Sequence, residues 1–208
     1  MTLIDSCGAA AHRSASVARS LARLVATLLA AVMPAPALAD AQALIATGDE
    51  ALGHLERRDF AGLGRQICPG RRLGYSPYAR NLTRLPVRWF DRGQVAGFAT
   101  STKAYFWGHY DGSGKKIVLT PSAYHDSFVL DRAYRTQGQR RLLEAESLRR
   151  EPELKALWAA YPGVSLVSYR YPGTPQLGNK DARELILILE ARASGACLRG
   201  VAHSEDTV

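Results

Sequence analysis

The chain has 208 residues, and its 27 basic and 19 acidic side chains give a formal net charge of +8. Apolar residues make up 47% of the sequence and charged residues 22%. This mixture excludes wholesale disorder, a collagen-like repeat and a coiled coil. The length is that of one globular domain with a short additional segment.

The first 39 residues have the layout of a secretory signal peptide. Three arginines precede an apolar run of ten residues from Leu24 to Met33, and Ala37-Leu38-Ala39 provides a small-residue cleavage site. The run is shorter than the roughly 20 residues that span a bilayer. The alternative interpretation of this segment is a buried first helix of the fold. We expect cleavage before Asp40, which lowers the formal net charge to +6. This predicts a periplasmic or secreted protein that is not transmembrane after cleavage.

Two cysteines, Cys68 and Cys197, remain after residue 39. In an oxidising compartment they can form a disulfide that closes a long loop. The alternative is two separate buried thiols. Since there is no Cys-x-x-Cys motif and no Cys/His cluster, the sequence predicts no metal site.

The first predicted elements are two helices and a strand. Asp40 is expected to cap a helix that runs to about Arg57 and carries apolar residues on one face. Asp59 is expected to start a shorter helix that ends near Ile67. A strand is predicted over residues 72–78, followed by a mixed loop over residues 81–97.

The middle of the chain predicts a β-hairpin. Aromatic residues 103–110 form its first strand, Asp111-Gly112-Ser113-Gly114 its turn, and residues 116–119 its second strand. Thr120 followed by Pro121 then predicts the start of a helix. Tyr124 and Phe128 are expected to face the core from that helix.

The C-terminal half predicts a strand meander after a charged segment. Residues 137–161 are helical in composition, a possible helical insertion, and residues 164–171 form a strand. Residues 185–189 are apolar on both faces, as in a central strand, and residues 196–203 form the last one. Because no β-α-β alternation is present, residues 40–208 are predicted to form a single α+β domain with N-terminal helices on a curved, mainly antiparallel sheet.

The residues that could transfer protons are few. Among the four histidines after residue 39, His54 is expected to be solvated and His125 is not a ready-made pair with its neighbour Asp126. The candidates for proton transfer are therefore His109, Asp111 and His203, and for each histidine the alternative is a structural or surface role. No Gly-x-Ser-x-Gly, phosphate-binding loop or dinucleotide motif is present, and no cofactor is predicted.

Aromatic side chains concentrate between residues 75 and 124. We take Tyr78, Trp107, Tyr110 and Tyr124 as candidate ligand-binding residues, because aromatic rings with polar groups often line cavities. Their alternative role is simply to fill the core.

Basic residues occur as scattered pairs at residues 71–72, 115–116, 140–141 and 149–150. Since aromatic side chains do not interleave with them, nucleic acid is not predicted as a partner. The pairs indicate either a solvated basic surface or weak attraction to anionic envelope components.

Several segments resemble a family of exported bacterial proteins of unknown function. They are Gly74-Tyr75-Ser76-Pro77-Tyr78, Trp107-Gly108-His109-Tyr110-Asp111-Gly112-Ser113-Gly114, Ile117-Val118-Leu119-Thr120 with Tyr124 and Phe128-Val129, Asp181-Ala182-Arg183-Glu184-Leu185, and Gly200-Val201-Ala202-His203. The resemblance implies no established activity. The order of elements is also similar to that of the cone-shaped nuclear transport factor 2-like fold, in which a curved sheet wraps around helices and leaves a pocket.

Three functions remain open on the sequence. The first is a non-enzymatic domain that binds a small apolar or aromatic molecule, or an envelope protein, in an aromatic-lined pocket. The second is a small enzyme that uses proton transfer by His and Asp. The third is a basic surface that binds anionic envelope components.

Overall fold

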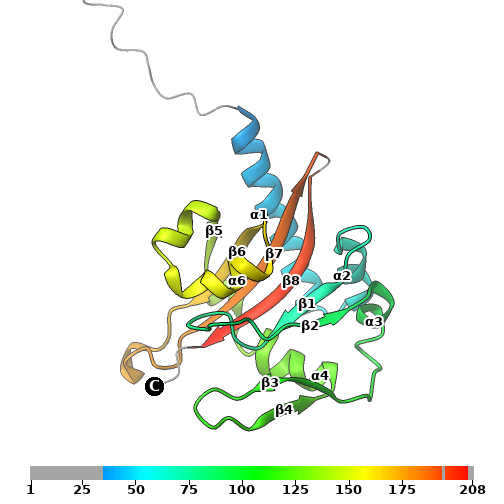
Figure 1. Ribbon diagram of the computed structural model, residues 1–208, viewed down its shortest axis with the longest axis vertical. Helices are drawn as coiled ribbons and strands as arrows, with labels where there is room; N and C mark the ends of the chain where they lie inside the picture. The colour runs from blue at the N-terminus through cyan, green and yellow to red at the C-terminus, as the bar shows by residue number, and fades with distance from the viewer. Residues whose placement is uncertain (1–34, 194, 206–208) are drawn as a thin grey trace, which may run out of the picture. The chain divides into compact units, whose positions relative to one another are not determined.

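The computed structural model of the protein describes residues 35–193 and 195–205 (Figure 1). Contacts divide the chain into residues 1–38 and 39–208. Most of the predicted signal peptide therefore lies outside the described residues. Helix α1 (Ala35–Glu56) already includes the predicted cleavage position, so the expectation that Asp40 caps this helix is wrong. Pro36 is compatible with the helix because the first turn tolerates proline.

After α1, the described residues form short helices and turns as well as the strands of two sheets. The helices are α2 (Phe60–Gln66), α3 (Arg92–Ala96), α4 (Pro121–Tyr124), which continues as a π-helical turn η1 (His125–Val129), α5 (Tyr134–Gln137), the 3-10 turns η2 (Ala145–Arg149), η3 (Pro152–Leu154) and η4 (Pro175–Leu177), and α6 (Lys155–Ala160). The strands are β1 (Leu73–Ser76), β2 (Arg88–Phe90), β3 (Tyr105–His109), β4 (Lys116–Leu119), β5 (Gln139–Leu143), β6 (Ser165–Tyr171), β7 (Arg183–Arg192) and β8 (Gly195–Glu205).

Six strands form a mixed sheet in the order β2-β1-β8-β7-β6-β5. Neighbouring strands are antiparallel except for β1 and β8, which run parallel with Tyr75 opposite Val201. The strands β3 and β4 form a separate two-stranded sheet. These observations confirm an α+β fold and the predicted hairpin.

Strand β7 is buried on both faces, as its apolar sequence predicts. Leu185, Leu187 and Leu189 belong to one core cluster, and Ile186 and Ile188 belong to the other. Helix α1 covers the first face and α6 the second (Figure 1). Helix α1 also lies close to the neighbouring strand β6, because a Cβ at Gly48 of α1 would lie 2.9 Å from Val167 Cγ1.

A disulfide joins Cys68 and Cys197. Ile67 forms a parallel bridge with Leu198, and the Cys68 N–H donates to the Leu198 carbonyl at 3.1 Å. These contacts bring the two cysteine Cα atoms to 4.9 Å, which is within the range for a disulfide. The predicted pairing is therefore confirmed.

The prediction of a helix over residues 137–161 is wrong for its first part. Gln139–Leu143 is the edge strand β5, paired with β6, and only the later residues form short helical segments. The residues of β5 are good helix formers, but pairing with an existing sheet overrides such propensities. The predicted loop over residues 81–97 likewise contains β2 and α3, the latter capped by Asp91 and Gln94.

Candidate functional site

A cavity of about 530 Å³ lies where the loop after β1, the β3–β4 hairpin and the end of β8 meet. Its lining combines aromatic and apolar residues with charged groups, and its volume is in the range of small-molecule sites. The lining residues are Tyr78, Arg80, Asn81, Leu82, Arg84, Pro86, Gly108, His109, Tyr110, Asp111, Ser204 and Glu205.

Tyr78 forms the polar contact between two walls of this cavity. Its Oη accepts a hydrogen bond from the backbone N–H of Asp111 at 3.2 Å, and its ring packs edge-on against Phe128. Burial, together with the charge of Glu205, raises the pKa of Tyr78 to about 12. The hydroxyl is therefore protonated at neutral pH.

The hairpin forms the opposite wall. Tyr110 is 39% exposed and its ring lies 6.0 Å from that of Phe128, while the His109 ring contacts Phe106 edge-on at 5.1 Å. Gly108, which precedes His109 on the same strand, has φ +141°, and a Cβ at this position would approach Pro77 Cγ to 3.4 Å. This conformation strongly favours glycine, and it lets the hairpin lie close to the loop.

Two of the four predicted ligand-binding residues do not line the cavity. Trp107 and Tyr124 are each 2% exposed, and their rings stack at 3.7 Å inside the core. The Trp107 indole N–H donates to the Leu119 carbonyl at 2.9 Å. Trp107 does not reach the cavity because side chains alternate between the two faces of a strand. This alternation turns Trp107 toward the core, as it does Ile117 on the paired strand β4. Tyr78 and Tyr110 are the predicted residues that do reach the cavity.

The three predicted proton-transfer residues are not all in one place. His109 and Asp111 line the cavity, whereas His203 is 1% exposed and lies outside the lining. Its Nδ1 is 3.1 Å from the Pro77 carbonyl oxygen and its Nε2 is 3.4 Å from Asp131 Oδ2. Both ring nitrogens of His203 thus face protein oxygens and not the cavity.

Asp131 is itself part of a buried polar group. Its carboxylate accepts a hydrogen bond from Tyr134 Oη at 2.7 Å and lies 3.3 Å from Arg183 Nε. Burial acts to raise the pKa of Asp131, but the interactions with His203, Tyr134 and Arg132 outweigh it and lower the pKa below its usual value. The arrangement holds the end of β8 in place behind the cavity.

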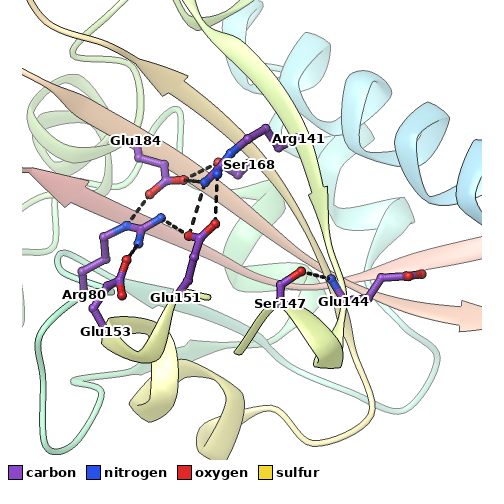
Figure 2. A network of polar contacts seen from close by, with 8 residues as sticks. All are labelled: Arg80, Arg141, Glu144, Ser147, Glu151, Glu153, Ser168 and Glu184. Carbon is purple, nitrogen blue, oxygen red and sulfur yellow. Dashed lines mark hydrogen bonds and ion pairs between the residues drawn. The ribbon is translucent and has the colours of Figure 1, made fainter. Parts of the chain in front are cut away.

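Arg80 lies beside the cavity at the centre of an ion network (Figure 2). Its side chain is only 8% exposed, and it donates through Nε to Glu184 at 2.6 Å, through Nη2 to Glu151 at 2.7 Å, and through Nη1 to Glu153. Burial acts to lower the pKa of Arg80, but Glu184 and Glu151 outweigh this and raise it. The guanidinium stays charged.

The carboxylates that bind Arg80 also contact residues of the sheet. Glu184 is 2% exposed and also accepts a hydrogen bond from the Ser168 hydroxyl, and Arg141 pairs with Glu151 at 2.9 Å (Figure 2). Burial acts to raise the pKa of Glu151, but Arg80 and Arg141 lower it overall. The network connects the loop after β1 to the sheet and to the turn η3.

Sequence reasoning missed the loop that carries much of the lining. Arg80, Asn81, Leu82, Arg84 and Pro86 lie in a segment that the sequence identifies only as a mixed loop. Asn81 adopts φ +58°, a left-handed conformation that asparagine tolerates better than most residues. The sequence signal of an ordered loop consisted of Pro77 and Pro86, which flank this segment, together with Asn81.

The other two histidines are structural. His54 is not solvated as predicted, because its Nδ1 lies 2.8 Å from Asp59 Oδ2 and its side chain is 11% exposed. His125 is buried against Phe60. Burial, followed by the nearby charge of Arg58, lowers the pKa of His125 to about 4, so the ring is neutral at pH 7.

Three potential metal ligands come together at Cys68, Glu190 and Cys197, where the two sulfurs form the disulfide and provide no thiolate. No helix within residues 35–193 and 195–205 is long and apolar enough to cross a membrane.

No known protein family, curated protein or solved structure matches the chain.

Proposed function

We propose that the protein is an exported, non-enzymatic domain that binds a small molecule in the cavity between the loop after β1 and the β3–β4 hairpin. The observation that carries this proposal is the lining itself. Tyr78 and Tyr110, from different elements, meet Leu82 and Pro86 around a volume of about 530 Å³. Aromatic and apolar walls with a few polar groups are typical of small-molecule sites.

Binding is better supported than proton-transfer catalysis. A catalytic histidine has to present a ring nitrogen to the substrate, and both nitrogens of His203 face protein oxygens. His109 and Asp111 remain at the cavity, but the Oδ1 of Asp111 already accepts the Gly112 N–H at 2.9 Å within the hairpin turn. Proton transfer in this cavity would therefore depend on His109, with Asp111 partly engaged by the turn.

The basic-surface alternative has less support than the cavity. Arg140 forms an ion pair with Asp49, and Arg141 pairs with Glu151 at 2.9 Å. These two cations lie on the edge strand β5, whereas Lys116 lies on the separate β3–β4 sheet. Basic pairs that are divided between two sheets, one of them internally paired, do not favour one anionic surface as the partner.

Export and the cone-shaped fold belong to the same proposal. The Cys68–Cys197 disulfide supports an oxidising compartment, in agreement with the signal peptide expected over residues 1–39. The strand order with β1 parallel to β8, and the cover of one sheet face by α1, support a nuclear transport factor 2-like arrangement.

Native mass spectrometry of the protein purified from the periplasm without reducing agent tests this function. We expect a retained small molecule, and we expect Tyr110→Ala to lose it. Val118→Ala is the matched control, since Val118 is exposed on the same hairpin but does not line the cavity. A ligand retained equally by both variants would place the binding site elsewhere and overturn the proposal.

A further inference from the structure

We propose, resting on the binding function above, that the cavity takes a small organic anion: an aromatic or apolar body that carries a carboxylate. The body would lie against Tyr78 and Tyr110, and the anionic group would be recognised by Arg84 and His109. The charged groups of the lining differ in whether other protein groups already neutralise them.

Most of the charged lining groups have protein partners. Arg80 is held by three carboxylates (Figure 2), and Glu205 lies 3.2 Å from Arg183 Nη2. Asp111 contributes to the hairpin turn through its contact with the Gly112 N–H. Arg80 and Glu205 therefore do not need a ligand to compensate their charge, and one oxygen of Asp111 is engaged within the turn.

Arg84 and His109 differ from Arg80, Asp111 and Glu205 in the same lining. Within residues 35–193 and 195–205, neither side chain has a hydrogen-bond or ion-pair partner. The acids of the lining are thus satisfied, while one cation and one imidazole are not. An incoming anion is the ligand that would complete this arrangement.

Arg84 is also placed where a ligand can reach it. It is exposed, and it lines both this cavity and a neighbouring groove of about 620 Å³ that includes Pro86 and Trp89. A guanidinium forms two parallel hydrogen bonds with a carboxylate. The apolar residues on both sides of Arg84 favour an anion with an organic body over inorganic phosphate.

The test compares matched pairs of ligands in calorimetric titrations. The probes are benzoate, 4-hydroxybenzoate and indole-3-acetate, each with its neutral amide. We expect at least one carboxylate to bind about tenfold more tightly than its amide, which corresponds to about 1.4 kcal/mol. Arg84→Gln is expected to remove this difference. Arg149→Gln, a change at an exposed arginine outside the cavity lining, is expected to keep it.

The outcomes separate this inference from the function on which it rests. If each amide binds as well as its acid and Tyr110→Ala weakens both, the anion preference is wrong and the binding function stands. If Arg84→Gln leaves the tenfold difference intact, the assignment of Arg84 is overturned. If none of the six compounds binds at millimolar concentration and the purified protein retains no molecule, both proposals are overturned.

Discussion

Tyr78 Oη accepts a hydrogen bond from the backbone N–H of Asp111 at 3.2 Å, which joins two segments that are 33 residues apart in the chain. The contact fixes the loop after β1 to the turn of the β3–β4 hairpin. The Tyr78 oxygen accepts this bond at neutral pH, and burial raises the pKa of Tyr78 to about 12, so that its ionisation lies well above that pH. The two walls of the cavity are therefore positioned before a ligand arrives, which reduces the entropic cost of binding.

The aromatic residues of the hairpin should separate into core and cavity residues by mutation. Trp107→Ala is expected to lower the free energy of unfolding by about 3–5 kcal/mol, since it removes a buried ring stacked on Tyr124. Tyr110→Ala is expected to cost less than about 1 kcal/mol, since Tyr110 is 39% exposed. Urea unfolding measures both, and equal losses would contradict the assignment.

Arg80 should be far more important for stability than a free surface arginine. Arg80→Ala leaves the buried carboxylate of Glu184 without its main partner, and such uncompensated charges cost about 3–5 kcal/mol. Arg150→Ala, at an exposed arginine, is the matched control and should change stability by less than about 0.5 kcal/mol. The same urea midpoint for both variants would show that the network contributes little.

The disulfide should stabilise the fold by limiting the unfolded chain. Its cysteines are separated by 129 residues, so replacing both with serine is expected to cost about 4–5 kcal/mol in the chain-entropy description. The wild-type protein in excess reductant should unfold at the same urea concentration as the double variant. If reduction has no effect on the unfolding midpoint, the bridge is not formed in solution.

His125 should make stability depend on pH. Its folded-state pKa of about 4 lies below the usual value of 6.5, so the unfolded chain takes up a proton as pH falls through 6.5 while the folded chain does not. Stability is therefore expected to fall between pH 6.5 and 4, by up to about 3 kcal/mol from this group.

Two histidine variants check the origin of that pH dependence. His125→Gln should reduce the slope of unfolding free energy against pH within this window. His109→Gln should leave it unchanged, since His109 is exposed. An unaltered slope in the His125 variant, or an NMR titration of His125 near pH 6.5, would be incompatible with a neutral buried ring.

The parts of the fold that the sequence could predict are those where local pattern and tertiary environment agree. Strand β7 is apolar on both faces and is buried on both, and Asp59 and Thr120 cap the helices α2 and α4 as expected. β5 could not be predicted, because pairing with β6 decides its conformation and its residues favour a helix.

The site could be predicted only in part for the same reason. Tyr78 and Tyr110 reach the cavity, but strand alternation alone does not show which face of the hairpin meets the core, so Trp107 was indistinguishable from them. Arg80 contacts Glu151, Glu153 and Glu184 at separations of 71 to 104 residues. Contacts at such separations carry no local sequence signal.

An NMR titration of the 15N-labelled protein with the tightest of the carboxylate probes tests the central claim most directly. We predict that the amide shifts concentrate in the loop around residues 78–86, in the hairpin at residues 108–111 and at residues 204–205, which together line the cavity. Shifts confined to the face that carries Arg141 and Arg150, or shifts spread evenly over the protein, would contradict a binding site in this cavity.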